Sequence, residues 1–217
     1  MSKFKHIDIE TWDRKEQYLF FREYDSPFFG LTANLDVTRL LAYTKSQKVS
    51  FFAAYLFASQ KQINAIPEFR YRLTTEGVIE FERVLAGSTV LKDNDLFTFC
   101  YFDHMDSFQG YHSHVKQRIA VCSRAETPLL DHDDDIAQIH YSVIPWVHFT
   151  SVTHPRNHKI IDSIPKIIFG KYAKDGTRML MPVSVEAHHA LLDGLHMGLY
   201  FKRFQECIND PETLLEG

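Results

Sequence analysis

Alternation of apolar and polar residues predicts several short strands along the chain. Residues 28–37 (FFGLTANLDV) alternate in their second half, which is typical of a strand with one buried face. Residues 96–102 (LFTFCYF) are apolar on both sides, so we expect a strand in the middle of a sheet. The pattern also predicts strands over 69–73, 78–82, 84–90, 139–151 (interrupted by Pro145), 167–172 and 177–188, with turns at TTEG and KDG.

Helices are predicted where apolar residues recur with a helical period between capping and stop signals. Ser50 precedes residues 51–66, which are rich in Ala, Phe and Leu, and a proline ends this run. Residues 108–121 and 195–208 each carry an apolar face, and the second of these helices ends at Asn-Asp-Pro. A short helix is expected over 39–45.

Strands that follow one another in sequence, separated by a few helices, favour an α+β or α/β two-layer sandwich with a mixed β-sheet. Hydrophobic residues make up 45% of the 217 residues, which is enough for a sizeable core. The sequence has no internal repeat and no low-complexity linker. We therefore expect residues 1–217 to form a single compact domain.

Charge and cysteine content exclude several classes of protein. The 24 basic and 28 acidic residues give a formal charge of −4, whereas a general nucleic-acid binder usually presents a basic surface. No apolar run approaches the roughly 18 residues of a membrane span, and the charged start lacks the apolar block of a secretory signal. The three cysteines are far apart and form no CxxC, which argues against a disulfide scaffold or zinc ribbon and favours the cytoplasm.

Common catalytic and nucleotide-binding motifs are absent, and three polar clusters are best explained as solvated surface. The sequence has no Walker loop, GxGxxG, GxSxG or HExxH. The DHDDD run at 131–135 lacks the glycine and spacing of a calcium loop. A basic cluster around Arg156 could attract a phosphate, but a plain surface is favoured. The same holds for His104, His112 and His114, which do not converge, so no metal site is expected.

The segment 183–200 (VSVEAHHALLDGLHMGLY) is the strongest candidate for chemistry. Adjacent strand residues point to opposite faces, so only one of His188 and His189 can face a given site. Asp193 lies at a turn before a helix, where it can cap that helix or pair with a cation. A histidine fixed at such a turn can serve as a general base near neutral pH. The alternative is a core histidine pair beside a capped helix.

The run from His189 to Gly194 fits the pattern HxxxDG, and further strings extend the match along the chain. These strings are TWDRKE (11–16), NAIPEFR (64–70), SVIPWV (142–147), FGKYAKDG (169–176) and MLMPVSVE (179–186), with DGLHMG (193–198) after the histidines. In this order and combination the chain resembles chloramphenicol acetyltransferase, a family of the CoA-dependent acyltransferase superfamily, from residue 11 to about residue 207.

The resemblance implies a role for each residue that matches the family pattern. His189 would be the general base, which takes the proton of a substrate hydroxyl so that the hydroxyl attacks acetyl-CoA without an acyl-enzyme. In the family this imidazole is held by a bond to its own carbonyl. Asp193 would pair with Arg14 and order the site, and Ser142 would stabilise the tetrahedral oxyanion. Activity should fade in acid, because a protonated imidazole cannot accept a proton.

The resemblance also implies where the two substrates bind. Trp146 and Tyr172 would line the CoA side of a tunnel, and the alcohol would enter from the other end. Family members are homotrimers whose sites lie between subunits, and they need no metal. The implied function is O-acetylation of chloramphenicol or a related small alcohol by acetyl-CoA. The residues that would line the acceptor pocket are Phe21, Phe29 and Phe97.

Several positions depart from the family pattern and leave other functions open. Ile168 stands where the family usually has a threonine that holds a water, Phe21 where it often has tyrosine, and Pro27 where it often has cysteine. The acceptor is therefore less securely implied than acetyl transfer itself. One alternative is an acyltransferase of the same fold with another alcohol or a thiol as acceptor. The other is a binder of small molecules without catalysis.

Overall fold

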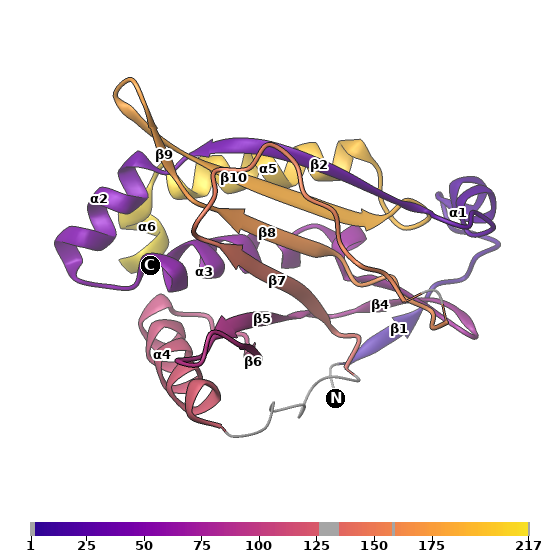
Figure 1. Cartoon of the computed structure of the whole chain (residues 1–217). Coiled ribbons are helices and arrows are strands. Elements are labelled where there is room, and N and C mark those ends of the chain that lie inside the picture. The colour runs from indigo at the N-terminus through magenta and orange to yellow at the C-terminus, as the bar shows by residue number, and fades with distance from the viewer. Residues whose placement is uncertain (1–2, 126–134, 158, 217) are drawn as a thin grey trace.

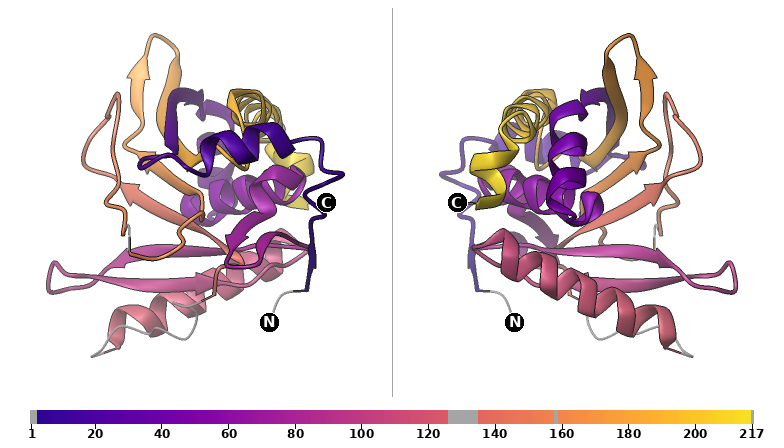
Figure 2. Two further views of the ribbon diagram at one scale, coloured as in Figure 1. Left: turned by 90° about the vertical axis from the view of Figure 1, so that its right-hand side faces the viewer. Right: turned by 90° about the vertical axis from the view of Figure 1, so that its left-hand side faces the viewer.

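The computed structural model describes residues 3–125, 135–157 and 159–216. A large mixed sheet crosses the molecule, with helices packed on one of its faces (Figures 1 and 2). Its strands follow the order β2-β10-β8-β7-β5-β6, and β9 pairs with the end of β10. Only the β7–β5 and β7–β8 pairs are parallel among the described strands. Their bounds are β2 Phe28–Asp36, β5 Leu85–Leu91, β6 Phe97–Phe102, β7 Gln138–Ile144, β8 Lys166–Gly170, β9 Ala173–Asp175 and β10 Arg178–His188.

A smaller sheet lies beside the large one and contains β1, β4 and β3 in that order. The predicted TTEG turn joins β3 and β4, with Gly77 at a φ of 125°, a conformation that favours glycine. Residues 69–70, which we predicted as strand, belong instead to the short 3-10 helix η1, because Pro67 fixes the backbone angle that begins it. The bounds are β1 Phe4–His6, η1 Pro67–Arg70, β3 Tyr71–Thr74 and β4 Gly77–Phe81.

Local sequence signals place the helices well. The Ser50 hydroxyl accepts a hydrogen bond from the Ala53 amide and so caps α3, as expected. The sequence did not predict α1 before β2, or the last helix, α6. The helices are α1 Lys15–Phe21, α2 Thr38–Gln47, α3 Phe51–Asn64, α4 Phe108–Arg124, α5 Gly194–Ile208 and α6 Pro211–Glu216.

The two faces of the large sheet differ in character. Alternate residues of β7, β8 and β10 point into the core, where α3 and α5 cover them. The opposite face carries polar side chains, and the irregular segment 145–157 crosses it (Figure 1). This polar face is the one on which the candidate chemistry lies. Core-facing residues are Ile139, Tyr141, Ile167, Phe169, Val183 and Val185, and outer-facing ones are His140, Ser142, Lys166, Ile168, Ser184 and Glu186.

The prediction that 96–102 forms a central strand is wrong, because β6 is at the edge of the sheet. Its apolar character has two separate causes. Thr98, Cys100 and Phe102 are buried on the face that packs against α4. Phe97 and Phe99 alternate with them on the other face, where they line a cavity. An apolar run can therefore mark an edge strand with a helix on one side and a cavity on the other.

The structure bears differently on the predictions made for the three polar clusters. Positions 131–134 of the DHDDD run lie outside the described residues. The expectation of a plain basic surface is wrong for Arg156, whose side chain is only 7% exposed and bonds Glu186 and Asp162. His112 and His114 accept hydrogen bonds from two different backbone amides and do not converge.

Candidate active site

The HxxxDG turn joins the end of β10 to the start of α5. The His189 amide donates to the Pro27 carbonyl at 2.8 Å, which ties the turn to the residue before β2. Asp193 is the residue before the first turn of α5, and the ring of His196 accepts a hydrogen bond from its amide at 2.9 Å. The His189 end of the turn is therefore held by the backbone before β2, and the Asp193 end by the side chain of His196 in α5.

Two aromatic rings hold the His189 imidazole. Phe21 stacks on one side, with ring centroids 4.0 Å apart and planes 4° from parallel. Phe29 stacks on it as well, at 4.2 Å and 26°. Nδ1 is buried, makes no hydrogen bond with the described residues, and lies 3.3 Å from a carboxylate oxygen of Asp193. The bond to its own carbonyl that the family resemblance implies is not formed, so stacking rather than hydrogen bonding orients the ring.

An ion pair fixes the other end of the turn. Arg14, directly before α1, donates to both carboxylate oxygens of Asp193, at 2.6 and 3.0 Å. It also donates to the His189 carbonyl at 3.4 Å. This fork-to-fork geometry is the strong form of an arginine–carboxylate contact. The hydrogen bonds from Arg14, with its charge, lower the pKa of Asp193 from its ordinary value.

His188 has a different role from its neighbour. It is 5% exposed, and its Nδ1 accepts a hydrogen bond from the Ala190 amide at 3.2 Å. Burial, reinforced by the charge of Arg156, lowers its pKa to about 4, so it is neutral near pH 7. Of the two histidines only His189 stacks between the pocket rings, as strand alternation predicts.

Ser142 lies elsewhere, on the polar face of β7. Its hydroxyl shares a hydrogen bond of 3.2 Å with the Thr89 hydroxyl of β5. Both border a cavity of about 450 Å³ that is also lined by Phe97, Lys166 and His140. Ser142 and Phe97 therefore belong to one concave region.

The segments that carry Trp146 and Tyr172 meet just beyond the carboxyl ends of the parallel strands β7 and β8. A hydrogen bond of 2.9 Å from the Lys171 amide to the Val147 carbonyl joins the two segments. Trp146 is 63% exposed, and Tyr172 meets the ring of Phe51 edge to face. The residues of β7 that line the cavity end at Ser142, and the segments with Trp146 and Tyr172 lie beyond that end of the strand.

The predicted site residues form two groups that are far apart within one chain. Ser142 lies opposite Ile168, and Ile168 lies opposite Ser184, whereas His189 is five residues beyond Ser184. At about 3.3 Å per residue and 4.8 Å between strands, His189 is roughly 17 Å from Ser142 along the sheet and about 10 Å across it. One group holds Arg14, Phe21, Phe29, His189 and Asp193, and the other holds Phe97, Ser142, Trp146 and Tyr172.

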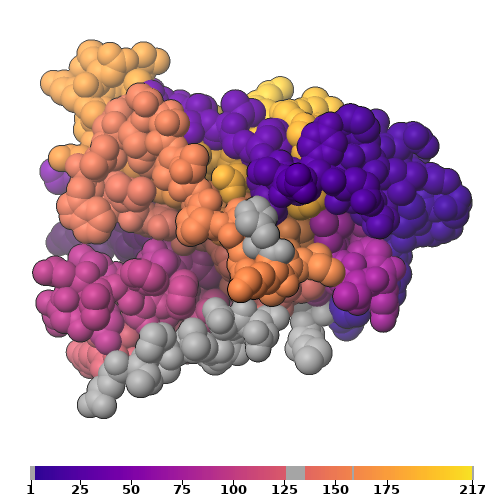
Figure 3. Space-filling model, turned by 45° about the vertical axis from the view of Figure 1, so that its right-hand side comes forward, coloured from indigo at the N-terminus to yellow at the C-terminus, as the bar shows by residue number. Residues whose placement is uncertain are grey.

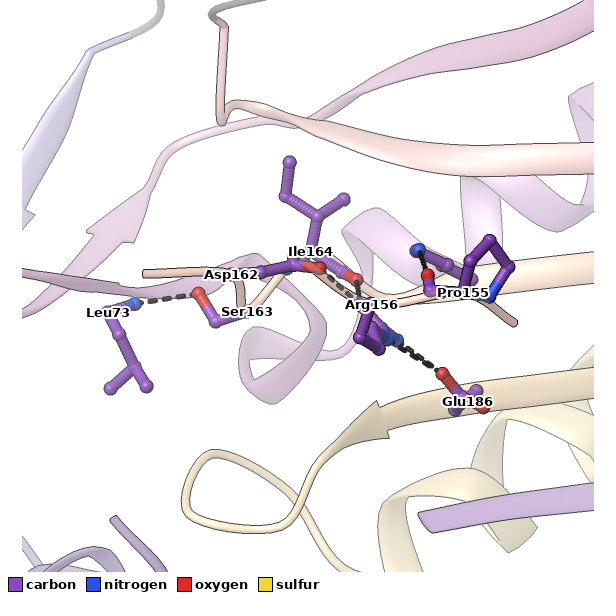
Figure 4. Close-up of polar contacts among 8 residues, drawn as sticks. Leu73, Pro155, Arg156, Asp162, Ser163, Ile164 and Glu186 are labelled. Carbon is purple, nitrogen blue, oxygen red and sulfur yellow. Dashed lines mark hydrogen bonds and ion pairs between the residues drawn. The ribbon is translucent and has the colours of Figure 1, made fainter. Parts of the chain in front are cut away.

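Sequence reasoning missed a buried ionic network behind the turn. Arg156 pairs with Glu186 at 2.6 Å and Asp162 at 2.8 Å (Figure 4). Its guanidinium lies 3.6 Å from the ring centroid of Phe28. Phe28 in turn meets His188 edge to face at 5.0 Å. The signal was Glu186, a carboxylate within the mostly buried half of β10, since a buried carboxylate requires a partner.

Ile168, which departs from the family pattern, lies between two pairs of hydrogen-bonded hydroxyl groups. Ile168 is buried and is the cross-strand neighbour of both Ser142 and Ser184. Ser184 bonds the Thr32 hydroxyl at 3.0 Å, and Ser142 bonds Thr89. The side chain thus interrupts a row of hydroxyl groups and cannot hold a water there.

Comparison with known proteins identifies the family. The family model described as chloramphenicol acetyltransferase matches residues 2–205. The chain belongs to the chloramphenicol acetyltransferase family. A chloramphenicol acetyltransferase of Clostridium perfringens is 27% identical over 215 residues, which cover 98% of this chain and 98% of that relative.

Solved structures agree with the chloramphenicol acetyltransferase fold. A chloramphenicol acetyltransferase structure superposes with a TM-score of 0.87 at 28% identity and covers 94% of this chain and 99% of its own. The dihydrolipoamide acetyltransferase of Azotobacter vinelandii has a TM-score of 0.70 at 17% identity, covering 92% of this chain and 88% of its own, and shares the fold. The predicted two-layer sandwich with a mixed sheet is confirmed.

Family membership makes the protein an acyltransferase of the chloramphenicol acetyltransferase type, with acetyl-CoA as its co-substrate. Within residues 3–125, 135–157 and 159–216, no cluster of three or more His, Cys, Asp or Glu side chains could hold a metal ion. None of the helices described is long and apolar enough to cross a membrane.

Proposed function

We propose that this protein transfers the acetyl group of acetyl-CoA to the hydroxyl of a small alcohol, and that chloramphenicol is the first acceptor to test. The observation that carries the proposal is His189, stacked between Phe21 and Phe29 on a turn pinned by Arg14 and Asp193. A base held in this way loses little freedom when it meets a hydroxyl.

The reaction needs one base and one oxyanion donor. His189 takes the proton of the alcohol, and the oxygen attacks the thioester carbonyl to form a tetrahedral oxyanion. The Ser142 hydroxyl donates to this oxyanion, an interaction typically worth about 3 kcal/mol in the transition state. Collapse breaks the carbon–sulfur bond, and the CoA thiolate leaves with the proton that His189 had taken.

The active unit in this proposal is a homotrimer with a site at each subunit boundary. The separation of His189 from Ser142 within one chain supports it, because an imidazole cannot serve an oxyanion that forms so far away. In a closed ring, the His189 half of one subunit meets the Ser142 half of the next. Acetyl-CoA would then approach past Trp146 and Tyr172, and the alcohol through the cavity beside Ser142.

The test is release of the CoA thiol from acetyl-CoA with and without chloramphenicol. We expect release that requires chloramphenicol and that falls by about 10²- to 10⁴-fold in His189→Ala, the usual contribution of a general base. His6→Ala, which removes an exposed histidine on β1, is the matched control and should leave the rate unchanged.

Other results separate the remaining functions. Release with other alcohols but not with chloramphenicol would keep the chemistry and change the acceptor. Release with dithiols alone would favour the thiol-accepting alternative. If no acceptor supports release while the protein still binds CoA, acetyl transfer is refuted and a non-catalytic binder is left.

A further inference from the structure

The cavity beside Ser142 has one aromatic wall and one polar wall. Phe97, Phe99 and Tyr101 line it from β6. His140 and Lys166 lie opposite each other on β7 and β8 and form part of the other wall. On the face shown in Figure 3, the magenta β5–β6 region lies below the orange segment that follows β7.

Lys166 is the only charged side chain among the described residues that line this cavity. The two histidines of the lining are neutral near pH 7. Burial, with the nearby charge of Lys166, lowers the pKa of His140 to about 4, and burial also lowers the pKa of His154. The described lining residues include no carboxylate, so their part of the wall carries a single positive charge.

The Lys166 ammonium retains capacity to bind a ligand. It donates to the Pro155 carbonyl at 2.9 Å, and in the described part of the chain no carboxylate is within ion-pair distance of it. Glu186, its cross-strand neighbour, bonds Arg156 instead, as does Asp162. An ammonium has three protons to donate, so two are left for a ligand.

A second polar atom of this wall has no partner among the described residues. Nε2 of His154 is buried and makes no hydrogen bond with the described residues. A buried polar atom without a partner is destabilising unless something else binds it. His154 and Lys166 therefore give this lining two polar groups that can meet a ligand, and they are close together because Lys166 bonds the carbonyl of Pro155, the next residue after His154.

The position of Lys166 relative to Ser142 sets the spacing of a ligand. Lys166 is the cross-strand neighbour of His140. His140 lies two residues before Ser142 on β7, a distance of about 7 Å along the strand. If a ligand places its hydroxyl beside Ser142, a second group on that ligand, separated from the hydroxyl by about one aryl ring, would lie near this ammonium. One ammonium matches a carboxylate, whereas phosphate sites usually combine several donors such as arginines or helix amides.

We infer that this acceptor cavity prefers an alcohol that carries a carboxylate over an uncharged one, with the carboxylate bound by Lys166 while the apolar part packs on Phe97 and Phe99. The inference rests on the proposed function for the hydroxyl, but binding of the carboxylate can be measured without turnover. Lys166 is in this view a residue that determines specificity and takes no part in proton transfer.

The probes are 4-(hydroxymethyl)benzoate and its uncharged analogue 4-(hydroxymethyl)benzamide. Titration calorimetry on the purified protein should show tighter binding of the benzoate, by about 10- to 100-fold, the usual value of a charge-assisted hydrogen bond. Lys166→Met should abolish this preference and leave benzamide binding within about twofold, because its side chain keeps a similar volume. Lys166→Arg should retain it, and Lys174→Met on exposed β9 is the control.

The outcomes separate this inference from the proposed function. Equal binding of the two probes, or no measurable binding of the benzoate, overturns the carboxylate assignment even if chloramphenicol supports thiol release. A Lys166→Met protein that loses both probes equally also overturns it, because the lysine would then only support the cavity wall. A carboxylate preference without thiol release supports the binding site and refutes the acetyl transfer.

Discussion

The ion pair between Arg14 and Asp193 should contribute a stability that is lost in acid, and this loss can be measured. Arg14 lowers the pKa of this carboxyl below its ordinary 3.8, so the ion pair stabilises the folded protein at every pH above that value. We expect Arg14→Met to lower the free energy of unfolding by about 1–2 kcal/mol near pH 7, a discounted value because the Asp193 side chain is 35% exposed. Below pH 3.8 the difference from wild type should shrink as Asp193 takes up a proton in the folded protein.

Urea unfolding of wild type and Arg14→Met between pH 7 and 3 provides the measurement. Arg39→Met is the matched control, since its ion pair with Glu212 is exposed and should contribute less than about 0.5 kcal/mol. A difference for Arg14→Met that stays constant down to pH 3 would mean that Arg14 acts through packing and not through the charge of Asp193.

At the scale of elements, one buried arginine connects the two sheets. Arg72 of β3 is fully buried and donates to the carbonyls of Phe69 and Tyr71 nearby and of Ile136 and Gln138 at the start of β7. Burial lowers its pKa to about 9, so it is charged near pH 7. Arg72→Met should cost about 3–5 kcal/mol and lower the melting temperature by roughly 10 °C, because these carbonyls lose their donor.

Differential scanning calorimetry checks this effect. Arg72→Lys should recover little of the loss, since one ammonium cannot replace the planar array of guanidinium donors. Arg178→Met, which removes an exposed arginine paired with Asp175, should leave the melting temperature close to that of wild type. A melting temperature of Arg72→Met within a few degrees of wild type would show that water replaces the guanidinium between the sheets.

The same scale explains why the sequence predicted helices better than the order of strands. Helix α3 is bounded by Ser50 and by a proline only a few residues from its ends, so local chemistry specifies it. The place of β6 depends on which strands pair, and its apolar pattern fits either a central strand or an edge strand beside a cavity. Strand order is a long-range property that periodicity does not contain.

In the candidate site, contacts between residues close in sequence could be predicted, whereas contacts between residues far apart in sequence could not. His189 and Asp193 are four residues apart in one turn, so their proximity follows from the motif. The Thr89–Ser142 and Arg156–Glu186 contacts span 53 and 30 residues, and only the folded sheet brings these side chains together. That His189 and Ser142 of one chain lie at different places on the same sheet could be anticipated only through the family resemblance, which implies sites between subunits.

That separation leads to a prediction for the whole molecule. If each site takes His189 from one subunit and Ser142 from the next, His189→Ala and Ser142→Ala proteins, each nearly inactive alone, should complement one another. Unfolding and refolding them together in equal amounts would place an intact histidine half beside an intact serine half at about a quarter of the sites in a closed ring. Thiol release by the mixture should therefore recover to about a quarter of the wild-type rate.

A second mixture makes this test specific. His189→Ala mixed with Asp193→Ala should stay at the level of the two separate proteins, because both changes damage the same half and no pairing restores it. If the first mixture also fails to recover, although each variant refolds and binds CoA, the two halves do not act between subunits. His189 would then need a conformational change within its own chain to reach Ser142, across a sheet whose hydrogen-bonded register places them roughly 17 Å apart along the strands.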